Sequence, residues 1–231
     1  MMQEKITAIV LAAGQGKRMK SSVQKQFMLV HDKPVLYYSL KTFEESSKIT
    51  DVVLVTGADE IDYCRREIVE RYGFSKVHHI VPGGKERYHS VYEGLKSCES
   101  ADYVYIHDGA RPFVDEDMIV RAYDEVKRSG ACVVGMPVKD TIKIADKEGN
   151  IAHTPNRSLV WMIQTPQVFT YDVVRKAYDL QMENENPSIT DDAMVVEQML
   201  GKKVRLVEGS YRNIKITTPE DIVLAEALLG Y

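Results

Sequence analysis

The segment ITAIVLAAGQGKRM, residues 6–19, joins an apolar run of eight residues to a loop that contains glycine and basic residues. A continuous apolar run of this length, followed by glycine, is typical of a strand that is covered on both faces of a sheet. The segment therefore predicts that the chain begins with a central strand and that a polar loop leaves the carboxyl end of that strand.

The alternation of apolar strand and helix then continues along the chain. Further apolar runs predict strands at 51–56, 76–81, 102–108, 131–138 and 203–208. Helical spacing of apolar residues predicts helices at 33–45, 61–72, the second half of 83–96, 115–130, 171–182, 190–200 and after Thr218. Such alternation is typical of parallel strands joined by crossover helices. The predicted fold class is α/β, with a Rossmann-like, mostly parallel sheet that is flanked by helices on both faces.

The alternation stops near Asp140. TIKIADKEGNIAHT, residues 141–154, contains two short β segments around a polar turn, which predicts an inserted β-hairpin arm at about 140–160. Such an arm is either an ordinary surface excursion or a structure that reaches a substrate or another subunit, and the sequence leaves both open. Because no repeat or low-complexity linker is found, we predict a single domain over residues 1–231.

Composition narrows the class of protein. The chain has 231 residues, a formal net charge of −4 at pH 7 and three cysteines, none in a CxxC spacing. The charge argues against nucleic-acid or membrane binding, and no apolar run approaches the ~20 residues of a membrane span. Separated cysteines and the lack of a signal-peptide pattern predict reduced thiols in a cytoplasmic protein.

The loop that follows the first strand is a candidate anion site. Residues 11–27 contain no acid and four bases, Lys17, Arg18, Lys20 and Lys25. A solvated basic loop is the alternative, but basic residues directly after a buried strand favour a phosphate ligand.

The backbone of this loop points to the same ligand. Its small residues, which let backbone N–H groups approach an anion closely, are Ala12, Ala13, Gly14 and Gly16. The glycine spacing excludes the Walker loop, and Met19 occupies the place of the third glycine in the dinucleotide fingerprint. The loop is therefore expected to bind phosphate in a way that neither motif describes.

A second polar segment follows the strand at 102–108. The carboxyl ends of neighbouring parallel strands meet at one edge of a sheet, so Asp108 is expected near the basic loop. A carboxylate beside a polyphosphate can hold Mg²⁺ through oxygen. The alternative is an aspartate that only forms the turn before Gly109.

The two segments LAAGQGKRM and KQF resemble the signature of nucleotidyltransferases that act on sugar nucleotides. The remaining segments are similar, in order, to the 2-C-methyl-D-erythritol 4-phosphate cytidylyltransferase family of non-mevalonate isoprenoid biosynthesis. These segments are PGGKERYHSVYEGL, HDGARPFV, PVKDTIK, TPNRSLVWMIQTPQVF, TDDA and NIKITTPED. The resemblance implies a nucleotide-diphospho-sugar transferase fold, transfer of a cytidylyl group from CTP to a polyol phosphate, Mg²⁺ or another divalent cation, and a homodimer.

The resemblance also assigns roles on the nucleotide side. Arg18, Lys25 and Lys215 match the catalytic bases of the family. The positions that match nucleotide contacts are Ala12, Ala13, Gly14, Gly16, Lys25, Gly84, Ser90 and Ala110. From the residues alone, Ser90 is equally well explained as an ordinary helix hydroxyl, and Lys215 as a strand-edge lysine that discourages aggregation.

On the acceptor side, the matching positions are Asp108, Arg111, Thr141, Arg157 and Lys215, with Asp108 also the predicted metal ligand. The arm of the family crosses to a neighbouring subunit, so Thr141 and Arg157 are expected to complete the site of the partner. Among residues outside this set, His107 and Trp161 are expected to be structural. Asp191 and Asp192 are expected to form a helix N-cap pair.

Two rival functions differ from this interpretation. A ribitol-5-phosphate cytidylyltransferase would have the same fold and another acceptor. A noncatalytic nucleotide-binding regulatory protein would bind CTP without releasing pyrophosphate, and the joint presence of Arg18, Lys25, Asp108 and Lys215 argues against it.

Overall fold

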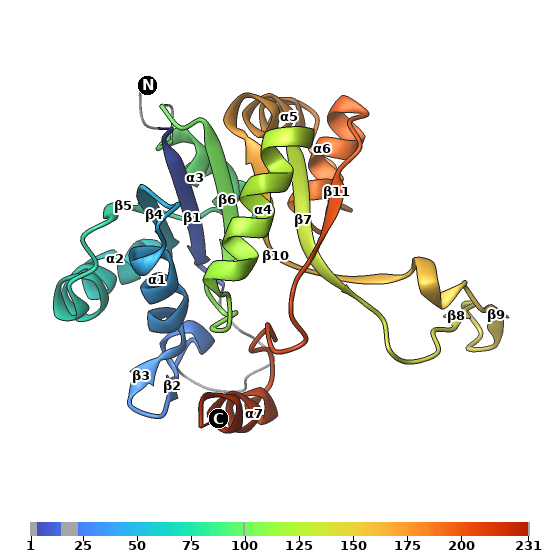
Figure 1. The fold of residues 1–231 in the computed structure, drawn as a ribbon, viewed down its shortest axis with the longest axis horizontal. Coiled ribbons are helices and arrows are strands. Elements are labelled where there is room, and N and C mark those ends of the chain that lie inside the picture. The colour runs from blue at the N-terminus through green and yellow to red at the C-terminus, as the bar shows by residue number, and fades with distance from the viewer. Residues whose placement is uncertain (1–3, 15–22, 99, 231) are drawn as a thin grey trace.

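The computed structural model describes residues 4–14, 23–98 and 100–230. Its centre is a seven-stranded sheet with the strand order β11-β7-β10-β6-β1-β4-β5 (Figure 1). The strands are β1 (Ile6–Ala12), β4 (Asp51–Thr56), β5 (Val77–Pro82), β6 (Tyr103–Asp108), β7 (Ala131–Pro137), β10 (Trp161–Thr170) and β11 (Arg205–Glu208).

The sheet is mostly parallel. Strand β1 pairs in parallel with β4 and β6, β4 with β5, and β11 with β7. Only β10 runs the other way, antiparallel to both of its neighbours, β6 and β7. The predicted parallel α/β sheet is therefore confirmed, with one reversed strand that the sequence pattern did not predict.

Helices cover both faces of the sheet (Figure 1). On one face are α1 (Val35–Glu45), α2 (Ile61–Tyr63) with its π-helical continuation Cys64–Glu70, and α4 (Glu116–Ser129). On the other are α3 (Arg87–Lys96), α5 (Tyr171–Glu183) and α6 (Asp192–Leu200). Strand β1 shows why its sequence is continuously apolar: Ala8 and Val10 pack on the first face, and Ile9 packs on the second.

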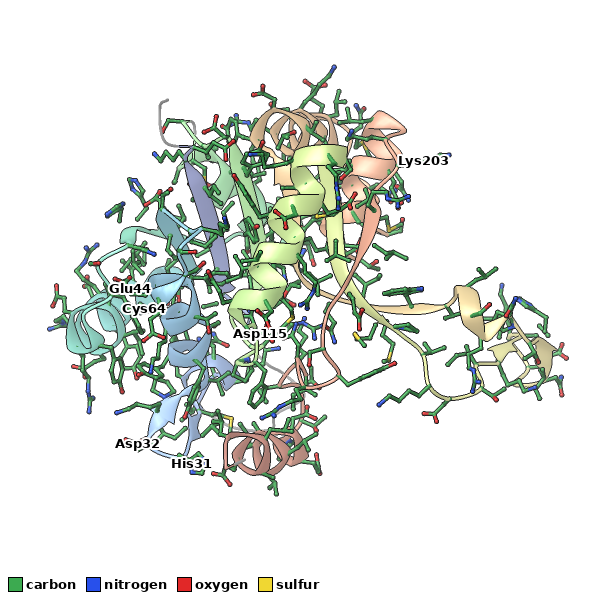
Figure 2. The ribbon with its side chains drawn as sticks, viewed as in Figure 1. His31, Asp32, Glu44, Cys64, Asp115 and Lys203 are labelled. Atoms are coloured by element: carbon green, nitrogen blue, oxygen red, sulfur yellow. The ribbon has the colours of Figure 1, made fainter. Side chains whose placement is uncertain are left out.

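The helix ends follow from local sequence. Asp115 precedes α4, and its carboxylate accepts a hydrogen bond from the Met118 N–H at 2.8 Å (Figure 2). Gly130 ends the same helix with φ 75°, a left-handed conformation that suits glycine. Asp191 caps α6 in the same way, accepting from the Met194 N–H at 2.9 Å. The predicted role of Asp191 is thus confirmed, whereas Asp192 is fully buried inside the first turn and does not act as a cap.

The arm leaves the body between β7 and β10. It contains the two-stranded sheet of β8 (Ile144–Ala145) and β9 (Ile151–His153), which confirms the predicted hairpin. It extends well away from the central sheet (Figure 1), and its side chains lie apart from those of the body (Figure 2). Ile151 and Leu159 on the arm are among the most exposed large apolar side chains of the described residues.

The C-terminal helix α7 (Pro219–Leu229) packs on a separate small apolar cluster. Val30, Val35 and Ile216 are buried in that cluster, beside the hairpin of β2 (Leu29–Val30) and β3 (Lys33–Pro34). A capping box of Thr218 and Asp221 starts α7, which begins directly after Thr218 as the sequence predicts. The helix predicted at 33–45 begins only at Val35, because Lys33 and Pro34 pair with β2.

The structure bears on the predictions about the cysteines and about membrane spans. Cys64, Cys98 and Cys132 are all buried and free, so none forms a disulfide. Among the described residues, no helix is both long enough and apolar enough to cross a membrane.

Candidate active site

A cleft of about 620 Å³ opens at the carboxyl ends of β1 and β6. Its walls come from β1 and the loop after it, the single helical turn Lys25–Phe27, the start of α3, the end of β6 and the segment before α7. The lining residues are Leu11, Ala13, Gly14, Lys25, Gln26, Gly84, Lys85, Glu86, Arg87, Ser90, Asp108, Ala110 and Lys215.

The sheet register brings the two predicted segments together. Leu11 on β1 is paired with Asp108 on β6 in the parallel ladder. The backbone N–H of Gly109 also donates to the carbonyl of Leu11 at 2.9 Å. The described start of the loop after β1, Ala13 and Gly14, and the HDGARP segment therefore leave the sheet side by side, as the rule for parallel sheets predicts.

Asp108 lies between two basic side chains that line the cleft. Its Oδ1 accepts from Arg87 Nε at 3.1 Å, and its Oδ2 accepts from Lys215 Nζ at 2.6 Å. The residue is only 8% exposed. Burial alone would raise the pKa of its carboxyl group, but the charges of Arg87 and Lys215 hold that pKa well below its ordinary value. Asp108 is therefore an anion at neutral pH.

The guanidinium of Arg87 is also bound by a second carboxylate, that of Asp192. Its Nη1 and Nη2 each donate to the Asp192 carboxylate at 2.8 Å, and the Tyr178 hydroxyl donates to Asp192 at 2.6 Å. A cation in the first turn of a helix is disfavoured by the positive end of the helix dipole. The paired carboxylates of Asp192 and Asp108 compensate for this position, and they raise the pKa of Arg87 although burial opposes the charged form.

His107 is hydrogen-bonded to residues around the end of β6. The Asp108 N–H donates to Thr165 Oγ1 at 3.1 Å, and Thr165 Oγ1 lies 3.1 Å from His107 Nδ1. His107 Nε2 lies 3.1 Å from the carbonyl of Arg111, so Nε2 is the ring nitrogen that donates. Burial lowers the pKa of His107 to about 4, and the ring is neutral at pH 7. These contacts give His107 a structural place.

The other wall of the cleft is a close backbone approach. A Cβ atom on Gly83 would lie 2.5 Å from Ala13 Cβ and 2.8 Å from Ser90 Oγ. Ser90 Oγ accepts from the Gly84 N–H at 3.1 Å. Only glycine fits at position 83, and the loop after β5 is thereby held against the loop after β1.

Gln26 fixes the helical turn that carries Lys25. Its side chain is almost fully buried, and its Nε2 donates to the carbonyl of Ala12 at 2.5 Å and to Oε1 of Gln24. Gln24 in turn donates to Glu60. This chain of amide contacts ties the Lys25 turn to the end of β1.

The donor set for a metal ion is small. Among the described residues, no three His, Cys, Asp or Glu side chains form a group that could hold a metal. Asp108 is the carboxylate in the cleft centre, and each of its oxygens already accepts from one base. One carboxylate fits Mg²⁺ when most of the other ligands are phosphate oxygens and water, which is how this ion is commonly bound beside nucleotides.

A model of the IspD family, described as 2-C-methyl-D-erythritol 4-phosphate cytidylyltransferase, matches residues 6–231. The chain belongs to this family. It is 55% identical over 226 residues to the 2-C-methyl-D-erythritol 4-phosphate cytidylyltransferase of Lachnoclostridium phytofermentans, with 98% of this chain and 97% of the relative covered. The corresponding protein of Lachnospira eligens is 50% identical over 224 residues, with 96% and 98% covered.

The fold agrees with solved structures of the IspD family. The crystal structure of 4-diphosphocytidyl-2C-methyl-D-erythritol synthase from Anaerococcus prevotii superposes with a TM-score of 0.87 at 34% identity. The match covers 99% of this chain and 100% of that one. The α/β nucleotidyltransferase fold expected from the sequence is therefore confirmed.

Many of the predicted site residues line the cleft. They are Ala13, Gly14, Lys25, Gly84, Ser90, Asp108, Ala110 and Lys215. Lining the cleft places these residues but does not establish their roles, which stay predictions. Gly16 and Arg18 were also predicted, and they lie outside the described residues, as do Lys17 and Lys20 of the same basic loop.

The other predicted residues lie elsewhere. Ala12 is buried at the end of β1, and Arg111 Nη1 donates to the Asn213 carbonyl at 2.8 Å. Thr141 and Arg157 are exposed on the arm, where Arg157 Nη1 donates to the Lys139 carbonyl at 2.8 Å. Within one chain, the structure does not bring the two arm residues to Asp108, and their expected place in a partner's site stays a prediction.

Sequence reasoning missed Gln26, Arg87 and Asp192. Arg87 had a usable signal, because a base at the start of a helix requires nearby acids to offset the helix dipole. Asp192 had none, since its partner is 105 residues away in the chain. Gln26 is ambiguous in sequence, because glutamine is more often exposed than buried.

Proposed function

We propose that the chain is a cytidylyltransferase that converts CTP and 2-C-methyl-D-erythritol 4-phosphate to 4-diphosphocytidyl-2-C-methyl-D-erythritol and pyrophosphate. The observation that supports this most directly is the charge arrangement of the cleft. A buried carboxylate, Asp108, lies between Lys215 and Arg87 at the carboxyl ends of β1 and β6, in a chain of the IspD family.

The reaction needs positioning and charge stabilisation rather than covalent work by the protein. A phosphate oxygen of the acceptor attacks the α-phosphorus of CTP, and a new P–O bond forms. The bond from that phosphorus to the oxygen bridging to the β-phosphate breaks, and pyrophosphate leaves with the electron pair. Negative charge increases on the oxygens around the α-phosphorus and on the leaving group.

The bases of the cleft meet this need. Lys25 and Lys215 line the cleft from two different segments of the chain, and their charges would stabilise the developing negative charge. Arg18 is proposed to act with them. The close backbone approach at Gly83 and Ser90 supports a binding place for the cytidine end of CTP, with Gly84 beside it and Ala110 lining the cleft from the loop after β6.

Mg²⁺, or another divalent cation, is proposed as the cofactor. Asp108 would hold it together with the phosphate oxygens of CTP, and the ion would supply charge neutralisation of the triphosphate. Lys215 contacts Asp108 at 2.6 Å through a flexible stem, so it can turn from the carboxylate to a phosphate when the nucleotide binds.

The acceptor side is proposed to be shared between two chains. Asp108 and Lys215 belong to the cleft, and Arg111 emerges from the same strand end. Thr141 and Arg157 would come from the arm of a second copy, which makes the enzyme a homodimer through residues 140–160. Exposed apolar side chains on the arm support a protein contact there. A cytoplasmic location is proposed as well, and three buried free thiols support it.

A pyrophosphate-release assay tests the proposal. Each of CTP, UTP, ATP and GTP is combined with 2-C-methyl-D-erythritol 4-phosphate or with ribitol 5-phosphate, with Mg²⁺ present. We expect turnover with CTP and the methylerythritol compound. A strong preference for ribitol 5-phosphate would replace the acceptor, and CTP binding without pyrophosphate release from either acceptor would indicate a noncatalytic protein.

A further inference from the structure

The carboxylate of Asp108 contacts an arginine, Arg87, that also forms an ion pair with a second carboxylate, Asp192. The Arg87 guanidinium donates through Nη1 and Nη2 to the Asp192 carboxylate, at 2.8 Å in both contacts. Through Nε it donates to Asp108 Oδ1 at 3.1 Å. One planar group therefore joins a carboxylate of the cleft to a carboxylate outside it.

Asp192 is not part of the cleft. It belongs to α6, its side chain has no exposed surface, and the hydroxyl of Tyr178 on α5 donates to it at 2.6 Å. A two-contact pair between arginine and carboxylate fixes the plane and the direction of the guanidinium. Arg87 cannot turn toward a ligand without leaving a buried carboxylate unpaired, which is strongly unfavourable.

Lys215 differs from Arg87 in this respect. Its side chain is 34% exposed, and among the described residues the Asp108 carboxylate is the side chain that its Nζ contacts, at Oδ2. A lysine is a point charge on a flexible stem, and it can exchange one anion for another. Arg87 is therefore the fixed partner of Asp108, and Lys215 is the movable one.

We infer that the Asp192–Arg87 pair is a positioning device for Asp108. The pair holds Oδ1 of Asp108 in place. Oδ2 therefore keeps its direction into the cleft after Lys215 has moved from it to a phosphate. The inference rests on the proposed function, in which Asp108 faces the phosphates of CTP. Arg87 and Asp192 are positioning residues, and Asp192 acts entirely through Arg87 because it cannot reach a bound nucleotide.

The test begins with Asp192→Asn, which removes the charge and keeps the shape. We expect kcat to fall about 10- to 100-fold, the scale of a small misplacement of a reacting group. The KM for CTP should change by less than about threefold, because the lost interaction matters mainly in the transition state. Asp191→Asn is the matched control, since it is the adjacent residue and asparagine caps a helix as well as aspartate. It should keep the wild-type kcat.

A second pair of proteins separates positioning from general damage. In an Asp108→Asn background, the Asp192→Asn change should lower kcat by less than about twofold, because residues that act as a unit are not additive. An equal fold-loss in both backgrounds would overturn the inference. So would a wild-type kcat in Asp192→Asn itself.

Two further measurements keep the test decisive. If Asp192→Asn does not fold, Tyr178→Phe keeps both charges and removes one hydrogen bond, and its loss of kcat should likewise vanish in the Asp108→Asn background. Thermal unfolding of the wild type, Asp108→Asn, Asp192→Asn and the double variant tests the same connection without measuring activity. If the wild type releases no pyrophosphate, the proposed function fails, whereas additive melting shifts for Asp108 and Asp192 would refute their connection through Arg87.

Discussion

Asp108 is a carboxylate that stays charged although almost no solvent reaches it. Its ionisation depends on two bases that are far apart in the chain, Arg87 and Lys215. Because these bases hold its pKa well below the ordinary value, its contribution to stability is present above pH 3.8 and is lost only as the pH falls below that value. Any loss of activity between pH 7 and pH 5 must therefore come from another group.

Lys25 is the described base whose loss should affect chemistry most directly. Lys25→Ala is expected to lower kcat by about two orders of magnitude or more, the effect of losing one charge-stabilising donor. Steady-state kinetics with CTP and the acceptor would measure this. Lys176→Ala, an exposed lysine on α5, serves as the control and should keep the wild-type kcat. A Lys25→Ala enzyme with unchanged kcat would exclude the proposed role.

His107 should make the fold sensitive to mild acid. Its pKa is about 4 in the folded protein and 6.5 in the unfolded chain, so the unfolded chain binds more protons between these values. The stability it contributes is therefore lost as the pH falls through this window. From pH 7 to pH 5, the free energy of unfolding should fall by about 2 kcal/mol through this residue alone.

Urea unfolding at several pH values measures this effect. His107→Gln keeps a donor for the Arg111 carbonyl but cannot titrate, so its stability should change less between pH 7 and pH 5 than that of the wild type. His153→Gln, on the exposed arm, should behave as the wild type does. Identical pH profiles for the wild type and His107→Gln would contradict the prediction.

At the scale of elements, the contact between the β5–α3 loop and the β1 loop depends on Gly83. Gly83→Ala would place a methyl group against Ala13 and Ser90, at separations that no real Cβ tolerates. We expect the free energy of unfolding to fall by about 1–3 kcal/mol, the usual cost of overpacking. The KM for CTP should rise, because the wall of the cleft must move. Gly230→Ala, whose nearest atoms are 3.7 Å from the added carbon, is the control for both measurements.

The elements that sequence predicts well are those with a local cause. DVVLVT is a strand over the predicted residues, because it is buried throughout and needs no particular partner. Helix α4 begins and ends within one residue of its prediction, because Asp115 and Gly130 define its ends.

The unpredicted element, β10, has a distant cause. Its sequence WMIQTPQVFT contains a proline and two glutamines that become buried. Gln164 donates to the Ser210 carbonyl at 2.7 Å, and Gln167 accepts from the Ala193 N–H at 2.8 Å. Polar residues can be buried in a central strand only when such partners exist. The partner of Gln164 lies 46 residues further along the chain, and that of Gln167 lies 26 residues further. The same reason hid Asp192 from sequence reasoning.

At the scale of the whole molecule, the arm decides whether one chain is enough for catalysis. If Arg157 completes the site of a partner, a mixture of Lys25→Ala and Arg157→Ala chains should regain activity. A mixed dimer has one site that takes both intact residues, so an equal mixture should approach about a quarter of wild-type activity. Activity is measured after the two variants are unfolded and refolded together.

The matched control mixes Lys25→Ala with Lys215→Ala. Both of these residues line the cleft of the same chain, so no mixed dimer has an intact site and no recovery is expected. Recovery in the control, or none in the test mixture, would contradict a site shared through the arm. The organisation of residues 1–231 as a single domain stays a prediction at this scale.

The reversed strand β10 also sets the order in which the molecule can be completed during synthesis. Strands β1, β4, β5 and β6 are all made by residue 108, yet β6 and β7 can join only through β10, which ends at Thr170. While the ribosome makes the intervening residues, the β6 edge has unpaired N–H and C=O groups that can bind another nascent chain. The half-sheet that carries Asp108 is thus exposed to aggregation until the segment beyond the arm has emerged.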